Sequence, residues 1–259
     1  MEDLSRSSGL ELKLNAKKHS LTLGKDLNKV KPVVRRLKEM KEVLAQKDIT
    51  KPAELYYMYR GLRESKDEFD IRKNKLRYDV TIIRPERLGN ELMKTAGHYH
   101  PGDYGELYEV LYGAAWCLLQ KKNTKNSRII EDVILVKAGP GDKIVIPPGY
   151  GHILINTGKT HLVVSNWVSS EFSPEYELYQ RGGGAAYFVF EDNLGERFEI
   201  NPHYQEVSKI RVARPAEKIA KFGLNSGMPM YLLLREQAKK LDFLNNPLKY
   251  DYSDVFVFL

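Results

Sequence analysis

Three histidines and one carboxylate form the pattern in this 259-residue sequence that could do chemistry. His98 and His100 are separated by one residue, Glu106 follows, and His152 comes shortly after the turn residues 147–149. Half of the chain's six histidines therefore fall in one arrangement. Three imidazoles and a carboxylate suit a divalent transition metal and leave coordination positions for water or substrate. The spacing predicts a metal centre.

The elements that must position these ligands are β-strands. Alternate residues of a strand project to the same side, so His98 and His100 share one side. Glu106, Tyr108 and Val110 share one side of the next strand for the same reason. With His152 at the start of a further β-rich run, two hairpins could bring all four ligands to one interior point.

Both ligand segments resemble the paired motifs of the cupin superfamily. The run 94–100, Lys-Thr-Ala-Gly-His-Tyr-His, looks like the cupin-type glucose-6-phosphate isomerases found chiefly in archaea. The run 76–83, Leu-Arg-Tyr-Asp-Val-Thr-Ile-Ile, is also similar to that family, and the likeness spans roughly residues 50 to 205. The general cupin pattern has a glycine six residues before the first histidine, where this chain has Leu92.

The resemblance implies a mainly β fold, a cupin β-barrel (double-stranded β-helix or jelly roll) with N- and C-terminal helical additions. Turn residues support this fold, because they divide residues 76–166 into short strands. The predicted turns lie at 85–90, 101–102, 121–127, 139–141 and 157–158. We expect an N-terminal extension with an amphipathic helix (1–50), a cupin barrel domain (51–212) and a C-terminal helical tail (213–259).

Apolar residues at intervals of three or four predict the two helical additions. The first begins at Pro32 and carries Val33, Leu37, Met40 and Leu44. The second precedes the stop signal at 245–247, and its face consists of Leu233, Leu234, Gln237, Ala238, Leu241 and Leu244.

The resemblance further implies metal-dependent interconversion of glucose 6-phosphate and fructose 6-phosphate. A divalent metal at His98, His100, Glu106 and His152 would bind the substrate's C1 and C2 oxygens and stabilise an enediolate. Glu106 is then either a permanent ligand or the base that carries the proton between the two carbons, and we favour the base. We expect one metal per subunit, with iron favoured and Mn, Ni, Co or Zn also compatible with the ligands.

The family also implies the groups that hold the sugar phosphate. In the family, two hydroxyls and a backbone amide bind the phosphate, and the matching positions in this chain are Thr81, Thr95 and Gly97. A tyrosine from about residue 59 reaches the substrate in the family, which makes Tyr59 a candidate. Trp167 stands at about the position of a family tyrosine near the metal, and Tyr176 could supply a hydroxyl from the same region.

Composition bounds the remaining possibilities. The net charge is +7, but basic residues are interleaved with acidic ones, so we expect no nucleic-acid partner, and the surplus favours the approach of an anionic substrate. No run of eighteen apolar residues and no signal peptide is present, which predicts a cytoplasmic protein without a membrane partner. The single cysteine, Cys117, lies in an apolar run and reads as a buried structural thiol. The resemblance implies a homodimer.

Three other functions share this ligand set. An Fe(II) dioxygenase could use the same four residues, and another sugar isomerase or epimerase could use them without requiring a phosphate. A non-enzymatic sugar-binding cupin normally tolerates lost ligands, and the intact set argues against it. A barrel alone does not separate these functions, because function resides in the site.

Overall fold

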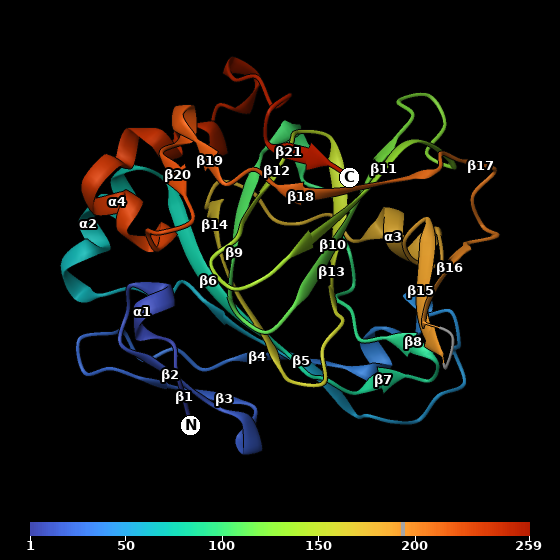
Figure 1. The fold of residues 1–259 in the computed structure, drawn as a ribbon, viewed down its shortest axis with the longest axis horizontal. Coiled ribbons are helices and arrows are strands. Elements are labelled where there is room, and N and C mark those ends of the chain that lie inside the picture. The colour runs from blue at the N-terminus through green and yellow to red at the C-terminus, as the bar shows by residue number, and fades with distance from the viewer. Residues whose placement is uncertain (193–194) are drawn as a thin grey trace.

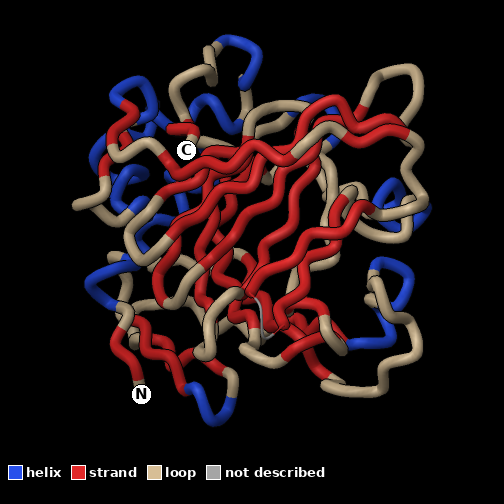
Figure 2. Tube along the Cα trace, turned by 45° about the vertical axis from the view of Figure 1, so that its right-hand side comes forward, coloured by secondary structure: helices blue, strands red, loops and turns tan. Residues whose placement is uncertain are grey.

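Two six-stranded sheets face each other across an apolar core in the computed structural model, which describes residues 1–192 and 195–259 (Figures 1 and 2). The first sheet runs in the order β13 (Tyr150–Asn156), β10 (Ala115–Lys122), β11 (Ile129–Ala138), β18 (Ile210–Pro215) and β21 (Phe256–Phe258), with β17 (Glu206–Val207) paired to β11. The second runs in the order β12 (Lys143–Ile146), β9 (Glu106–Tyr112), β14 (Leu162–Ser169), β6 (Leu76–Ile83), β5 (Glu54–Arg60) and β4 (Val33–Arg36).

Every pair in the second sheet is antiparallel, and the first sheet is antiparallel except where β17 and β18 join β11. Two such sheets closing on one core form a jelly roll. The predicted mainly β, cupin-type fold with helical additions is confirmed. Most strands of residues 76–166 also fall between the predicted turns, but Arg87–Leu88 forms a short strand inside the turn predicted at 85–90, and β10 extends into the one predicted at 121–127.

Smaller elements surround the barrel (Figure 1). Short strands make a three-stranded sheet of β1 (Glu2–Asp3), β2 (Leu12–Asn15) and β3 (Ser20–Leu23), a four-stranded sheet of β16 (Gly195–Ile200), β15 (Tyr187–Asp192), β8 (Glu91–Leu92) and β7 (Arg87–Leu88), and the pair β19 (Lys218–Ile219) and β20 (Leu224–Asn225). The α-helices are α1 (Ser5–Ser8), α2 (Glu68–Lys73), α3 (Glu177–Arg181) and α4 (Leu233–Gln237). Turns of 3-10 helix cover Ala16–Lys18, Leu37–Glu39, Lys41–Val43, Ser65–Asp67, Pro101–Asp103, Ala220–Phe222, Met230–Leu232, Ala238–Leu244 and Pro247–Lys249.

The helix predicted from Pro32 is wrong. Residues Val33–Arg36 form strand β4, which pairs with β5. Two β-branched valines favour a strand. An edge strand satisfies half of its backbone hydrogen-bonding groups by pairing with its single neighbour. The buried positions Leu37, Met40 and Leu44 follow in 3-10 turns, whose three-residue period also matches the spacing of the apolar residues.

The helical segment predicted before 245–247 is present as α4 followed by the 3-10 segment Ala238–Leu244, although strands β19, β20 and β21 also lie within residues 213–259. It packs against the second sheet, where the Trp167 indole Nε1 donates to the Met230 carbonyl at 3.0 Å. The three-segment division stays a prediction. Strand pairing crosses both of its boundaries, because β4 pairs with β5 and because β18, which spans the second boundary, pairs with β11.

Cys117 is buried on β10, and burial raises the pKa of its thiol, as expected for a structural residue. Across the residues that the structure describes, every helix is too short or too polar to cross a membrane.

A buried carboxylate anchors the tail. Asp67 accepts a hydrogen bond from the Tyr231 hydroxyl at 2.7 Å and pairs with Arg235 at 2.7 and 2.9 Å. Burial opposes ionisation, but Arg235 and Tyr231 outweigh it and lower the pKa of Asp67 below its ordinary 3.8. The resulting stability is complete above pH 3.8 and is lost as the pH falls through the lowered pKa.

Replacing Asp67 with Asn should therefore destabilise the protein at neutral pH. We expect the free energy of unfolding to fall by about 1–3 kcal/mol at pH 7, because the variant loses charge-assisted hydrogen bonds. Urea titrations should show this gap shrinking below about pH 4, where the unfolded chain protonates Asp67, and closing as the pH falls through the lowered pKa of the folded protein. The exposed Asp70→Asn variant is the matched control. A gap between wild type and Asp67→Asn that is the same at pH 7 and at low pH would refute this account.

Candidate metal centre and active site

A cavity between the two sheets is lined by three of the four predicted ligands, His98, His100 and Glu106. One wall comes from alternating residues of β5, β6, β9 and β14, and the other from segment 95–100 and Leu154. The residues that line it are Tyr56, Met58, Arg60, Arg77, Asp79, Thr81, Thr95, Ala96, Gly97, His98, His100, Glu106, Tyr108, Leu154, Asn166, Val168, Pro174 and Tyr176.

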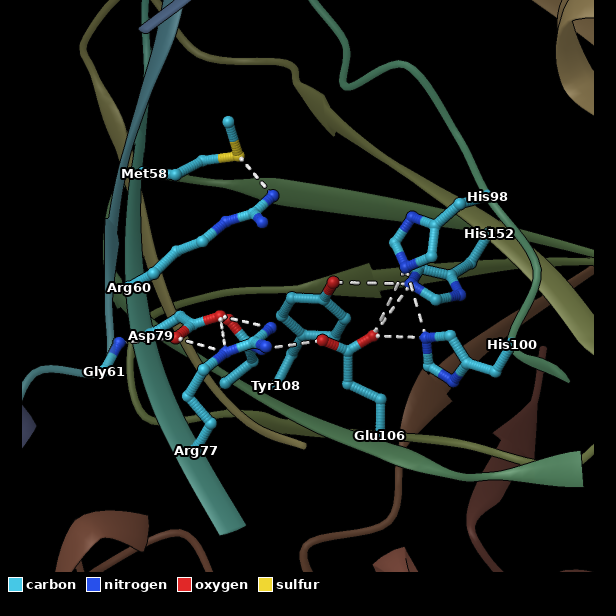
Figure 3. Close-up of polar contacts among 11 residues, drawn as sticks. Met58, Arg60, Gly61, Arg77, Asp79, His98, His100, Glu106, Tyr108 and His152 are labelled. Carbon is cyan, nitrogen blue, oxygen red and sulfur yellow. Dashed lines mark hydrogen bonds and ion pairs between the residues drawn. The ribbon is translucent and has the colours of Figure 1, made fainter. Parts of the chain in front are cut away.

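His98, His100, Glu106 and the buried His152 converge on one point at the edge of this cavity (Figure 3). Their potential ligand atoms all lie within 4.8 Å of one another. Glu106 Oε2 is 3.8 Å from His98 Nε2, 3.2 Å from His100 Nε2 and 3.1 Å from His152 Nε2. Strand geometry sets this arrangement, since His98 and His152 exchange backbone hydrogen bonds of 3.3 and 3.1 Å between their two segments.

The residues fit a bound cation. Glu106 Oε2 is buried and has no hydrogen-bond partner among the described residues, although three ring nitrogens point at it. The Nδ1 of His100 lies 2.9 Å from the Tyr104 carbonyl, which can only accept, so Nδ1 carries the proton and Nε2 turns its lone pair to the centre. Lone pairs converging on a carboxylate repel one another unless a cation lies between them, so a divalent transition metal suits this donor set.

Electrostatics favour the ligating forms of these residues. Burial, with the nearby His152 and His100, holds the pKa of His98 well below its usual range, so its imidazole is neutral. Burial opposes ionisation of Glu106, but the adjacent His100 and His152 outweigh it and hold its pKa well below its usual range. Neutral imidazoles and an ionised carboxylate are the forms that bind metal.

Two neighbouring side chains contact the ligands. The Asn166 side-chain amide donates to Glu106 Oε1 at 2.7 Å, which leaves Oε2 for the imidazoles and fixes the orientation of the carboxylate. The Tyr108 hydroxyl lies 3.3 Å from His152 Nε2, the same nitrogen that faces Glu106.

Thr81, Thr95, Gly97 and Tyr176 all line the cavity, as predicted for substrate contacts, and their roles stay predictions. Thr95 Oγ1 accepts the Leu154 backbone N–H at 3.0 Å, so its hydroxyl hydrogen remains available to donate. Gly97 has a φ of +79°, and a Cβ there would collide with the Tyr179 ring. Glycine is therefore required at this position.

Two predicted residues lie elsewhere. The Tyr59 hydroxyl accepts the Leu21 backbone N–H at 2.9 Å on the other face of β5, outside the cavity. Trp167 also faces away and stacks on Tyr231 at 5.6 Å, whereas its neighbours on β14 line the cavity. The cavity receives Tyr56 from β5, and the Tyr56 hydroxyl accepts the Ala96 N–H at 3.3 Å.

The sequence analysis missed five polar residues of the cavity: Tyr56, Arg60, Arg77, Asp79 and Asn166. Period-2 alternation could have found two of them, because Arg77 and Asp79 share a strand face with Thr81. Asp79 is buried, which raises its pKa, while Arg77 and the Gly61 backbone N–H act in the opposite direction.

Comparison with known proteins identifies the family. The glucose-6-phosphate isomerase (GPI) family profile matches residues 25–206. The chain belongs to the glucose-6-phosphate isomerase family. Glucose-6-phosphate isomerase from Thermococcus litoralis is 31% identical over 185 residues, 69% of this chain and 90% of the relative. The enzymes named so from Pyrococcus abyssi and Thermococcus kodakarensis are 26% and 25% identical, over 68% of this chain and 89% of each relative. Members of this family are aldose–ketose isomerases.

Solved structures resemble the chain more distantly. Oxalate decarboxylase from Bacillus subtilis has a TM-score of 0.35 at 15% identity, covering 59% of this chain and 31% of that chain. An oxalate oxidase has a TM-score of 0.32 at 18% identity, and the match covers 39% of this chain and 46% of that chain. The family assignment rests on the sequence match.

Removing one ligand should remove the metal. We expect the wild type to hold one divalent ion per chain and His98→Gln to bind it at least about tenfold more weakly, because an amide is a poorer ligand than imidazole. Metal analysis after dialysis against a competing chelator measures this. His203→Gln, which alters an exposed histidine outside the cavity, should behave as wild type. Equal metal retention by His98→Gln and wild type would contradict the ligand assignment.

Proposed function

We propose that this chain interconverts glucose 6-phosphate and fructose 6-phosphate at one divalent metal held by His98, His100, Glu106 and His152. The observation that carries the proposal is the convergence of these four side chains, three of which line one cavity, in a chain that belongs to the glucose-6-phosphate isomerase family. A dioxygenase could use the same ligands, but the family match favours the isomerase.

The difficult step is the transfer of a proton between C1 and C2 of the open-chain sugar. A divalent cation at this site would act as a Lewis acid on the oxygens of these two carbons. Glu106 then takes the C1 proton of fructose 6-phosphate and returns it to C2. We assign the proton to Glu106 Oε1, because Oε2 faces the imidazoles. Asn166 holds that oxygen in place through its amide N–H.

The phosphate lies away from the ligands in this proposal. The hydroxyls of Thr81 and Thr95, with the backbone amide of Gly97, donate to it. The Thr81 hydroxyl makes no hydrogen bond with residues 1–192 or 195–259, which leaves it available for a ligand. Tyr176, whose ring centroid is 5.6 Å from that of His98, covers the cavity between the two ends of the sugar.

Replacing Glu106 with Gln tests the base and the ligand roles separately. If Glu106 is the base, turnover of fructose 6-phosphate should fall at least about 100-fold while KM changes little, because an amide cannot accept the proton. A coupled assay of glucose 6-phosphate formation, with bound metal measured in the same samples, gives both quantities. The wild type treated with EDTA and then with single divalent metals is the control.

Near-normal turnover by metal-loaded Glu106→Gln would eliminate the base role. A wild type that binds metal but does not convert fructose 6-phosphate with any metal added would eliminate the isomerase proposal itself. Iron is our first candidate for the metal, and the ranking of restored rates among Fe, Mn, Ni, Co and Zn decides it. The homodimer stays a prediction from the resemblance, which light scattering tests, and the cytoplasmic location stays a prediction from the sequence.

A further inference from the structure

Arg60 is an unpaired arginine on the wall of the candidate active site. It ends β5 on the face that lines the cavity, and it is solvent-exposed. Its one side-chain hydrogen bond to a described residue runs to the Met58 sulfur at 3.6 Å, and a thioether is a weak acceptor. It forms no salt bridge with any residue in the described ranges 1–192 and 195–259. Most of its five N–H donors therefore remain available to a ligand.

Two other arginines lie nearby, and one of them pairs with a carboxylate. Arg77 binds both oxygens of Asp79 at 3.0 Å, and Asp79 also accepts the Gly61 N–H at 2.9 Å. Arg60 interacts electrostatically with Asp79, but the hydrogen bonds that this carboxylate accepts come from Arg77 and the Gly61 backbone.

The other arginine, Arg35, lies over two aromatic rings. Its guanidinium carbon is 5.9 Å from the Tyr56 ring centroid and 5.3 Å from the Tyr176 ring centroid. Arg35 does not line the cavity. Arg60 is thus the cavity-lining arginine without an anionic partner among the described residues.

The direction of the Arg60 side chain places its charge near the threonines. Figure 3 shows the guanidinium reaching toward Met58 and away from the Arg77–Asp79 pair. Met58 pairs with Thr81 across β5 and β6, and both residues line the cavity. The free guanidinium therefore lies on the side of the cavity that carries Thr81.

We propose that Arg60 is a specificity-determining residue that pairs with the phosphate of the substrate. This inference rests on the proposed function, in which Thr81, Thr95 and Gly97 hold that phosphate through neutral donors. Neutral donors leave the charge of a dianion uncompensated, whereas an arginine fork matches two phosphate oxygens. Arg60 would thus favour a phosphorylated sugar over the free sugar.

The test compares wild type, Arg60→Gln, Arg60→Lys and Arg36→Gln, all loaded with metal. Arg36 is the matched control, because it removes the same charge from an exposed side chain outside the cavity. Calorimetry measures the binding of inorganic phosphate, and the coupled assay gives KM and kcat for fructose 6-phosphate. Melting curves confirm that each variant is folded.

We expect Arg60→Gln to weaken phosphate binding and to raise KM by about 10- to 100-fold, because it loses a charge-assisted pair, with kcat within about threefold of wild type. The phosphate affinity and KM of Arg60→Lys should lie between those of wild type and Arg60→Gln, since lysine keeps the charge without the planar fork of donors. Arg36→Gln should match wild type.

Unchanged phosphate binding in Arg60→Gln would overturn the inference, as would a loss confined to kcat. The two proposals fail in different ways. If Arg60→Gln loses phosphate affinity while wild type shows no turnover, the anion subsite stands and the isomerase proposal falls. If wild type isomerises fructose 6-phosphate and Arg60→Gln keeps the same KM, the isomerase proposal stands and the role of Arg60 falls.

Discussion

A buried carboxylate surrounded by three imidazoles is the constraint on which the rest of this structure depends. Glu106 lies within 3.8 Å of all three ring nitrogens, and its Oε2 has no hydrogen-bond partner among the described residues. Burying an ionised carboxylate is costly unless an opposite charge or hydrogen bonds compensate it. Contacts with His100 and His152 favour the ionised form of Glu106, but neutral imidazoles carry no positive charge to balance it. A divalent cation at the point where the four side chains converge satisfies all of them at once.

The jelly roll holds this cluster in place through pairing that is independent of the ligands. The His98 and His152 segments are joined by backbone hydrogen bonds, and β9, which carries Glu106, is fixed between β12 and β14. Residues 1–24 and 207–259 lie outside the family match, yet the second of these segments packs on the barrel through Met230 and Tyr231. The tail stabilises the sheet on the side away from the cavity, since Trp167 contacts it there.

How much of the site could be predicted depended on the pattern of each strand. The metal cluster was predictable, because His-x-His and the later Glu106 and His152 combine ligand type with period-2 spacing. Tyr59 was misplaced because β5 is buried on both faces, and a continuous apolar run does not reveal which residues face the cavity. Trp167 presents the same difficulty, since every residue of β14 is buried. Arg60 could not be singled out from the sequence. Its proposed role rests on the lack of a salt bridge with any described residue, and only the structure shows this.

The most direct test of the central claim is anomalous diffraction at the metal's absorption edge from crystals of the metal-loaded protein. The account predicts one anomalous peak per chain, about 2.0–2.2 Å from an imidazole nitrogen of His98, His100 and His152 and from an oxygen of Glu106. A peak elsewhere, or a loaded protein with no peak between these four side chains, would contradict it.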